Sequence, residues 1–408
     1  MTQIDRAWGG GPSVNYEALA SRFRPLFARF REGAAKRDLE RRLPDQEFAD
    51  LKKAGFGALR VPKEYGGAGA SLPELFALLI ELSEGESNLT QAYRAHFGYV
   101  EDVINSADPS RRDRWLGRVG RGDVFGGAWS ETGESAKLDA FSTRVTGQPG
   151  DLRLDGRKYY TTGSLFADWI DVGATNEAGE GISVVVSRHD PGVDIQDDWD
   201  GIGQTLTASG SATFHRVALD PADISKADLR FGYAPAFFQL FQLANIAGIG
   251  RALATDLARA VAARTRTYTH AAASRSSEDP QVLQVVGRVR GAAYASGAIV
   301  LQVAEALQRA ADARQDATAF ETAVHIAELE SAQAQTVITD LVLHAATIAF
   351  DALGASAVKR DAGLDRHWRN VRTLASHNPR IYKDRIVGDY AVNGTAPPPQ
   401  WRVGRPAE

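Results

Sequence analysis

The chain has 408 residues, of which 44% are apolar and 24% are charged, a composition typical of a soluble globular protein with about two or three domains. Its formal net charge of -4 leaves no basic excess to neutralise phosphates, so we expect no nucleic-acid partner. The absence of cysteine excludes disulfides, thiolate metal sites and a cysteine nucleophile. The first residues lack the apolar core of a signal peptide, and no apolar run approaches the ~20 residues that span a bilayer. We therefore expect a cytoplasmic protein with no membrane partner.

Residues 1–122 are predicted to form a helical domain. One apolar face in this region repeats at spacings of four and three and consists of Leu19, Phe23, Phe27 and Phe30. A glycine-rich turn at 65–71 superficially resembles a nucleotide-binding loop, but no βαβ unit with an acidic residue about 20 positions later accompanies it. We therefore favour a structural turn, after which Ser71 is a plausible N-cap of a strongly apolar helix.

A second helix of this domain carries a histidine among aromatic residues: Tyr93, His96, Phe97 and Tyr99. This cluster could form the wall of a binding pocket, with His96 as its polar member. A histidine on an apolar face is, however, more often a core residue whose hydrogen bonds are satisfied within the protein. The sequence leaves both interpretations open.

Residues 123–228 are predicted to form a small β-domain, because short runs of branched and aromatic residues alternate with turn residues. Three polar, glycine-punctuated turns lie within it, at 126–135, 158–164 and 201–211. Hydroxyls and backbone N–H groups at strand ends can hydrogen-bond the rim of a polar heteroaromatic ring. The side chains that could stack on such a ring are Trp129, Tyr159, Tyr160 and Trp169. Each turn alone would be ordinary, but three in one small domain favour a binding site.

Residues 229–408 are predicted to be helical again. Long apolar-periodic runs cover 237–264, 281–311 and 317–353, and their length and polar faces favour an up-and-down bundle. The proline-rich end at 394–401 is predicted to be an extended tail. The histidines lie without metal-ligand spacing, and there is neither a G-x-S-x-G elbow nor a P-loop. We therefore expect no metal, and hydrolase and kinase chemistry rank low.

The order of these segments resembles that of the acyl-CoA dehydrogenase superfamily of flavoproteins over nearly the whole chain. The turns at 128–131, 158–162 and 203–211 are similar to the three flavin-contacting turns of that superfamily, and 369–372 resembles the arginine-rich signature before its catalytic glutamate. The resemblance implies an α+β, mainly α fold with an N-terminal helical domain, a small middle β-domain and a C-terminal four-helix bundle. It also implies a homotetramer in which the tail packs on a neighbouring subunit.

Two departures from the superfamily's pattern indicate its monooxygenase branch. The segment 373–379 contains no carboxylate, and it holds His377 at or within one residue of the position of the catalytic base. The segment 264–270 replaces the Arg-x-x-Phe-Gly stretch that helps to hold a dinucleotide flavin, which favours FMN over FAD. These features, together with 95–99 and 376–379, are similar to dibenzothiophene monooxygenase and to the sulfone and sulfinate monooxygenases of sulfur acquisition.

The resemblance to this branch implies a two-component flavin-dependent monooxygenase. Such enzymes accept reduced FMN from a separate NAD(P)H:flavin reductase, bind O2 and form a C4a-(hydro)peroxyflavin. That species oxygenates the substrate, here expected to be a small or aromatic organosulfur compound. Two alternatives remain open: an FAD-dependent acyl-CoA dehydrogenase with an unrecognised base, and a catalytically silent flavin-fold binding protein.

The same resemblance implies roles for individual side chains. The expected catalytic residues are His96 and His377, acting on bound oxygen from opposite walls, and Thr161, acting near flavin N5. The residues expected to hold FMN are Trp129, Ser130, Thr162 and Arg266. The residues expected to contact the substrate are Tyr99 and Tyr159. For Arg266, phosphate binding through its guanidinium and an ordinary surface charge are equal alternatives.

Overall fold

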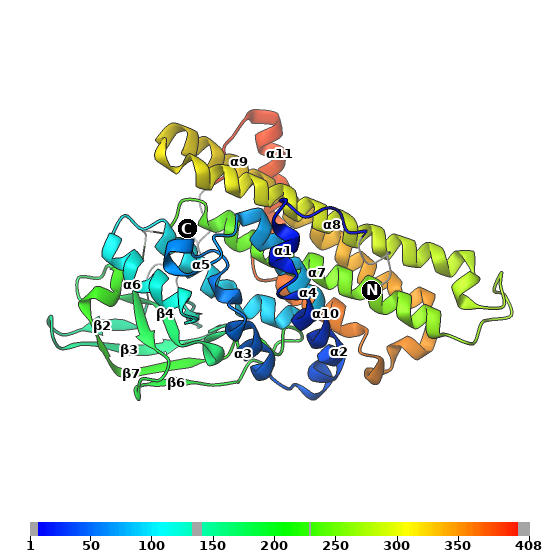
Figure 1. Ribbon diagram of the computed structural model, residues 1–408, viewed down its shortest axis with the longest axis horizontal. Helices are drawn as coiled ribbons and strands as arrows, with labels where there is room; N and C mark the ends of the chain where they lie inside the picture. Colours follow the sequence, from blue (N-terminus) through cyan, green and yellow to red (C-terminus); the bar gives the residue numbers. More distant parts are fainter. Residues whose placement is uncertain (1–6, 133–140, 228–229, 399–408) are drawn as a thin grey trace, which may run out of the picture.

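The computed structural model describes residues 7–132, 141–227 and 230–398. The last part of the first predicted turn, 133–135, and the end of the predicted tail, 399–401, lie outside these residues. The described chain is mainly helical with one mixed sheet, which confirms the predicted fold class. Figure 1 shows the sheet at one end of an elongated molecule and long helices at the other. No helix in the described ranges has the length and apolar character needed to cross a bilayer.

Six helices form the N-terminal part: α1 (Tyr16–Ala20), α2 (Arg24–Glu40), α3 (Asp45–Lys53), α4 (Leu72–Ala92), α5 (Arg94–Ile104) and α6 (Pro109–Gly120). The predicted apolar face is confirmed, since Phe23, Phe27 and Phe30 are all buried in the main core. Buried aromatic side chains remove a large apolar area from water, so these phenylalanines help to hold α2 against α4.

The buried helix α4 is the axis of this part. The predicted N-cap Ser71 is confirmed: its hydroxyl accepts the N–H of Glu74 at 3.3 Å, and the Glu74 carboxylate accepts the N–H of Ser71 at 2.8 Å. The helix is interrupted at Glu86, whose φ of -157° is not helical. Glu86 is buried, and the residues after it face the turns of the sheet, as described below.

The sheet consists of β1 (Phe125–Ala128), β2 (Arg144–Thr146), β3 (Leu152–Lys158), β4 (Trp169–Thr175), β5 (Gly181–Ser187), β6 (Val193–Ile195), β7 (Ala212–Leu219) and β8 (Ile224–Lys226). Their order is β6-β7-β3-β2-β4-β5-β8, and β1 pairs with β4 in parallel. β3 and β7 run antiparallel, with Lys158 opposite Ala212. A further bridge joins Ser130 to Tyr159. The segments after β1, after β3 and before β7 therefore lie side by side.

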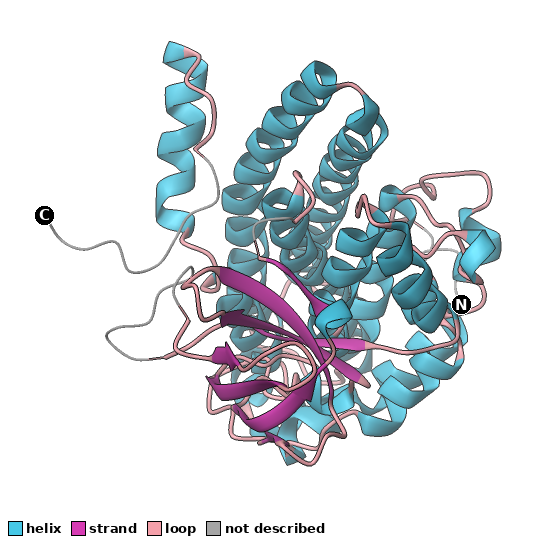
Figure 2. Ribbon diagram, turned by 90° about the vertical axis from the view of Figure 1, so that its left-hand side faces the viewer, coloured by secondary structure: helices cyan, strands magenta, loops and turns pink. Residues whose placement is uncertain are grey.

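The C-terminal bundle consists of α7 (Ala234–Ala263), α8 (Pro280–Asp312), α9 (Ala317–Ile348) and α10 (Asp365–Ala375). The predicted helices at 237–264 and 281–311 are confirmed. The one predicted at 317–353 ends as an α-helix at Ile348 and continues into a 3-10 turn. α7 is buried along most of its length because it packs against α4 as well as α8 and α9. Figure 2 shows helices packed behind the sheet.

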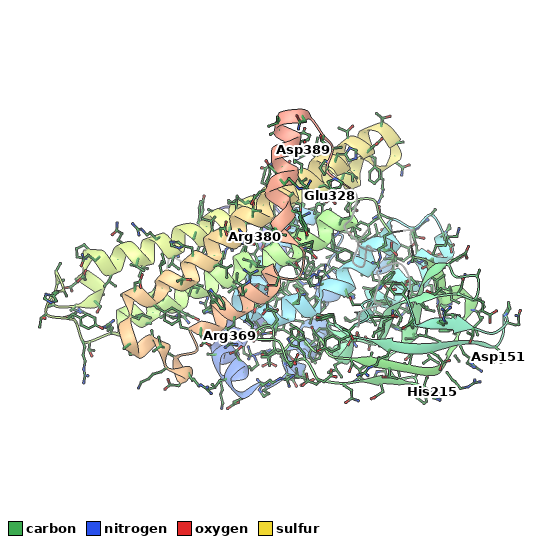
Figure 3. The ribbon with its side chains drawn as sticks, turned by 180° about the vertical axis from the view of Figure 1, so that it is seen from behind. Asp151, His215, Glu328, Arg369, Arg380 and Asp389 are labelled. Atoms are coloured by element: carbon green, nitrogen blue, oxygen red, sulfur yellow. The ribbon has the colours of Figure 1, made fainter. Side chains whose placement is uncertain are left out.

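The last helix, α11 (Lys383–Asn393), contacts α9 and has no buried residue. Figure 3 shows Asp389 of α11 and the preceding Arg380 near Glu328 of α9, well away from Asp151 and His215 at the far edge of the sheet. α11 is therefore an arm on the surface of the bundle rather than a part of its core.

Candidate functional site

The three predicted turns come together in the structure. The N–H of Tyr159 donates to the carbonyl of Ser130 at 3.0 Å, which joins the second turn to the first. The N–H of Thr161 donates to the carbonyl of Gly210 at 3.1 Å, and the N–H of Gly163 donates to that of Thr207 at 3.0 Å. The second turn is therefore held between the other two by backbone hydrogen bonds.

The two neighbouring threonines of the second turn differ in what their hydroxyls do. Thr161 is fully buried and donates its hydroxyl proton to the carbonyl of Gly210 at 3.0 Å. Thr162 is partly exposed, and its hydroxyl lies 2.6 Å from that of Ser209. Thr161 thus has no proton left to donate to a ligand, so its predicted role near flavin N5 has no support from this geometry and remains a prediction. Thr162 is the better placed of the two.

The turns contain strained backbone. Among the described residues, five residues other than glycine have a positive φ, and three of them lie in the second and third turns: Tyr160 at 58°, Gln204 at 52° and Ala208 at 50°. Such conformations cost about 1 kcal/mol or more each, and they concentrate at ligand-binding sites. Tyr160 is half exposed, with its ring 5.8 Å from that of Trp199. The predicted substrate contact Tyr159 lies beside it, with ring centroids 4.7 Å apart.

The helices hold these turns in place from behind. The N–H of Gln204 donates to the Asn370 side chain at 2.6 Å, and the N–H of Leu206 donates to that of Asn88 at 3.1 Å. A Cβ on Gly163, whose φ is 79°, would overlap the carbonyl oxygen of Ala92. The turns therefore rest on the junction of α4 and α5 and on α10.

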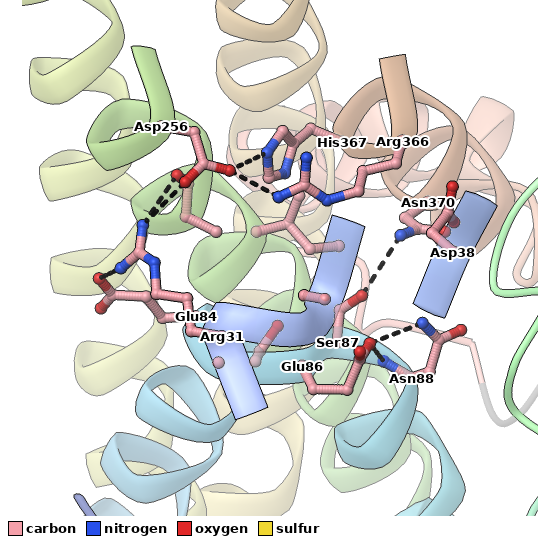
Figure 4. A pocket seen from close by; sticks show the side chains of 15 residues that line it. Arg31, Asp38, Glu84, Glu86, Ser87, Asn88, Asp256, Arg366, His367 and Asn370 are labelled. Atoms are coloured by element: carbon pink, nitrogen blue, oxygen red, sulfur yellow. Dashed lines mark hydrogen bonds and ion pairs between the residues drawn. The ribbon is translucent and has the colours of Figure 1, made fainter. Parts of the chain in front are cut away.

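A cavity of about 30 Å³ lies behind the third turn, between α2, α4, α7 and α10 (Figure 4). Its wall includes Asp256, which binds Arg31, Arg366 and His367 at 3.3, 2.6 and 3.0 Å. A cavity of this size holds one or two waters. It is far too small for FMN, so its polar network serves to join the helices.

Beside the first turn, a row of cationic and aromatic side chains leads away from the sheet. Trp129 donates from Nε1 to Asp171 at 2.9 Å, and Arg230 binds the same carboxylate at 3.0 Å. The Arg230 guanidinium lies 4.1 Å from the Trp129 ring centroid and 5.8 Å from that of Phe238. On Phe238 the guanidinium of Arg94 stacks at 4.7 Å. Both arginines make cation–π contacts.

His377 stands at the end of this row, directly after α10. Its Nδ1 lies 2.9 Å from Oδ1 of Asn378, whose amide donates to Gln239 at 2.5 Å. These bonds assign the proton to Nδ1 and leave Nε2 with its lone pair. Desolvation, and then the charge of Arg94, lower the pKa of His377 to about 4. The side chain is nevertheless exposed.

We call Trp129, Arg230, Phe238, Arg94 and His377 the arginine–histidine row. The sequence interpretation found Trp129 and His377 but missed Arg94, Phe238 and Arg230. Only Arg94 left a local signal, because a charged residue there interrupts a run of apolar and aromatic neighbours. Phe238 and Arg230 have no such signal.

His96 is a satisfied core residue in this structure. It is fully buried, its Nε2 donates to the carbonyl of Gly57 at 2.8 Å, and its Nδ1 accepts the N–H of Phe125 at 3.1 Å. Both ring nitrogens are therefore in use, and desolvation lowers the pKa of His96 to about 4. Its catalytic role remains a prediction without geometric support, and of the two interpretations the structure favours the core histidine.

The neutral state of His96 predicts a loss of stability in mild acid. The unfolded chain takes up a proton below its ordinary pKa of about 6.5, whereas the folded state does not until about pH 4, so stability is lost as pH falls from 6.5 towards 4. From pH 7 to pH 5 this costs about 2 kcal/mol. Urea unfolding at pH 7 and pH 5 measures this loss of unfolding free energy. In His96→Gln the loss should be smaller than in the wild-type protein by that amount. In His344→Gln, on the exposed face of α9, it should equal the wild-type loss. An undiminished loss in His96→Gln would show that another group is responsible.

Two further predicted residues lie away from the row. Tyr99 is buried, with its ring stacked 4.1 Å from Phe125 and edge-on to Trp115, so its predicted contact with the substrate has no support from this geometry and remains a prediction. Arg266 is exposed in the loop between α7 and α8, and Figure 1 shows that loop at the end of the bundle opposite the sheet. Within one chain it does not approach Ser130 or Thr162, whose roles remain predictions.

No three His, Asp or Glu residues in the described part of the chain form a metal-binding group.

Comparison with known proteins identifies the family. The models for "Acyl-CoA dehydrogenase, N-terminal domain" and "Acyl-CoA dehydrogenase, C-terminal domain" match residues 15–123 and 240–379, together more than half of the chain. The chain is 26% identical over 391 residues to dibenzothiophene monooxygenase of Mycolicibacterium goodii, covering 92% of this chain and 94% of that protein.

Two solved structures are similar over almost their whole length. TdsC from Paenibacillus sp. A11-2, in complex with FMN and indole, superposes with a TM-score of 0.84 at 26% identity, covering 94% of this chain and 99% of TdsC. The methanesulfinate monooxygenase MsuC from Pseudomonas fluorescens gives 0.84 at 26% identity, covering 93% and 98%. The predicted resemblance is thereby confirmed, and the chain belongs to the acyl-CoA dehydrogenase family, beside its flavin-dependent monooxygenases.

Proposed function

We propose that the chain is an FMN-dependent monooxygenase that oxygenates an organosulfur compound and receives reduced FMN from a separate flavin reductase. The observation that carries this proposal is His377, an exposed neutral histidine beside the flavin turns, in a segment (373–379) that contains no carboxylate. A dehydrogenase needs a carboxylate base there. A monooxygenase needs a group that can handle a proton next to bound oxygen.

The turns fit a flavin ring. Ser130 and Tyr160 are exposed and Thr162 is partly exposed, whereas Thr161 is enclosed, so polar and aromatic groups line one side of the three joined turns. Trp129 borders this side. Bound reduced FMN would supply two electrons to O2, so that one oxygen atom enters the substrate and the other leaves as water. Trp129, Ser130 and Thr162 would hold the ring.

His377 would accept a proton at Nε2 and return it. Its Nδ1–H is held by Asn378, so only Nε2 can exchange a proton with a ligand. To act as the donor that the sequence predicts, Nε2 must first be protonated. Negative charge bound nearby favours this, because it raises the pKa of the imidazole from the low value set by desolvation and by the charge of Arg94.

Arg266 would reach FMN phosphate only from a second copy of the chain, since its loop and the sheet occupy opposite ends of one molecule. A homotetramer fits this requirement, and it also fits the exposed apolar side chains on and before α11, such as Ile381 and Val392, each 81% exposed. A neighbouring subunit would cover α11, which contacts α9 but has no buried residue of its own. Action in the cytoplasm rests on the sequence alone.

The proposal is tested by mixing the protein anaerobically with reduced FMN and then with O2, without substrate. We expect reoxidation slower than that of unbound FMN, with a transient absorbance distinct from those of reduced and oxidised FMN. NADH alone should give no turnover until a flavin reductase is added. Reoxidation at the rate of unbound FMN would contradict the proposal. Bleaching of tightly bound FAD by an acyl-CoA thioester would establish the dehydrogenase instead.

A further inference from the structure

Arg94, the first residue of α5, is placed directly against the flavin turns. A Cβ on Gly127 of the first turn would lie 2.9 Å from that of Ala95, and Gly163 of the second turn abuts Ala92. The Arg94 guanidinium extends over the ring of Phe238 at 4.7 Å, and its Nε donates to the Phe238 carbonyl at 3.4 Å. The side chain is thus fixed in direction by an aromatic face and by one long hydrogen bond.

The positive charge of Arg94 is not balanced by any described carboxylate at ion-pair distance. Three other arginines of low exposure do pair with carboxylates: Arg230 with Asp171 at 3.0 Å, Arg111 with Asp102 at 2.7 Å and Arg60 with Glu101 at 2.9 Å. Leaving a charge in a desolvated place without a partner is costly. A site with this arrangement is stabilised when an anion binds to it.

The titration behaviour of the row agrees with this reading of the geometry. Desolvation, and then repulsion from Arg230, lower the pKa of Arg94 to about 10. The charge of Arg94 in turn contributes to the low pKa of His377. The outer end of the row therefore has a positive potential, next to His377, whose Nε2 is free to exchange a proton with a ligand.

We propose that Arg94 binds the anionic acid group of the substrate, so that this chain selects small organosulfur acids of the sulfinate type over neutral sulfur compounds. This rests on the proposed monooxygenase function and names its substrate class. The guanidinium suits the two oxygens of a sulfinate, which it can bind through parallel N–H···O contacts. His377 would stand beside the sulfur.

The reaction balances with the co-reactants already named. A sulfinate, O2 and reduced FMN give a sulfonate, oxidised FMN and water. A sulfur–oxygen bond forms and the O–O bond breaks; the sulfur is oxidised by two electrons, and reduced FMN supplies two more electrons and two protons for the water. The product keeps its negative charge, so Arg94 holds substrate and product alike, and its removal should affect binding more than the chemical step.

The test compares two probes of similar size, methanesulfinate and the neutral dimethyl sulfone, which keeps both oxygens but carries a second methyl group on the sulfur and no charge. Calorimetric titration of the FMN-loaded protein should show tighter binding of methanesulfinate. Arg94→Gln should weaken methanesulfinate binding by about 10- to 100-fold, as expected for loss of a charge-assisted hydrogen bond. It should not weaken the binding of dimethyl sulfone. Arg94→Lys should recover part of the loss, because it restores charge but not the planar pair of donors.

Arg118→Gln is the matched control, since the Arg118 guanidinium stacks on Trp169 at 4.6 Å, away from the row. This variant should bind both probes with wild-type affinity. Equal affinity of the wild-type protein for the two probes would overturn the proposal, and this comparison needs no variant. A parallel loss of FMN affinity in Arg94→Gln would also overturn it, by assigning the arginine to the flavin. The reoxidation experiment uses no substrate, so failure of the monooxygenase proposal is recognised separately.

Discussion

Replacing His377 with alanine is expected to lower turnover of an organosulfur substrate by about 100- to 10,000-fold, the range for loss of a positioned acid–base group. FMN should still bind, because the His377 ring bonds to Asn378 and makes no hydrogen bond to the described residues of the three turns. The measurement is product formation with an added flavin reductase, together with FMN binding followed by fluorescence quenching.

His344→Ala serves as the control, because His344 is exposed on α9 and far from the turns in sequence and structure. Asn378→Ala provides a second comparison. It removes the partner of Nδ1 and frees the ring to rotate, so we expect a smaller loss than in His377→Ala. Unchanged turnover in His377→Ala would remove the residue from the mechanism. Loss of FMN binding would assign it to the cofactor instead.

The fold and the turns could be predicted because their signals are local. The helix cap at Ser71 involves residues only three positions apart. The three turns are marked by glycines and hydroxyl side chains between strand-forming residues. The order of helical, strand and helical periodicities is likewise carried by short windows of sequence. These features needed no knowledge of which distant residues meet.

The roles of His96 and Thr161 could not be predicted in the same way. Aromatic neighbours in sequence are expected for His96 whether it lines a pocket or lies in a core. The two cases differ in whether its ring nitrogens are already bonded, and here they are bonded to Gly57 and Phe125, 39 and 29 positions away. For Thr161 and Thr162, one of two adjacent residues of the same turn is enclosed and the other is partly exposed, directly after Tyr160 with its positive φ. Neither fact is visible in a short window.

Arg94 shows the same limit from the opposite side. The sequence shows a charge within an apolar segment, but a carboxylate elsewhere in the chain could have neutralised it, as Asp171 does for Arg230. Only the assembled structure separates a paired arginine from an unpaired one. Ion pairs between residues distant in sequence thus determine the charge of the arginine–histidine row, whereas local sequence patterns determine its helices and turns.

Replacing Glu86 with alanine is expected to lower the free energy of unfolding by about 3–5 kcal/mol, the usual loss when one partner of a buried ion pair is removed. Glu86 is 4% exposed and Arg37 is 2% exposed, and their carboxylate and guanidinium groups meet at 2.9 and 3.0 Å. Without Glu86, Arg37 keeps only Glu47 and a backbone carbonyl as acceptors. Chemical unfolding measures the loss, and Glu40→Ala, in an exposed pair with Lys36, should change stability by less than ~0.5 kcal/mol.

The same substitution should weaken FMN binding even where the variant remains folded. Glu86 also accepts the Asn88 amide at 2.7 Å, and Asn88 in turn accepts the N–H of Leu206 in the third turn. The buried carboxylate thus orients the side chain on which a strained turn rests, and Figure 4 shows it beside Asn88 and Ser87. An unstable variant that binds FMN at wild-type affinity would show that the third turn keeps its shape without the Glu86 carboxylate. Because Asn88→Ala leaves the Arg37 pair intact, it should lower FMN affinity with a smaller loss of stability, which separates the two effects.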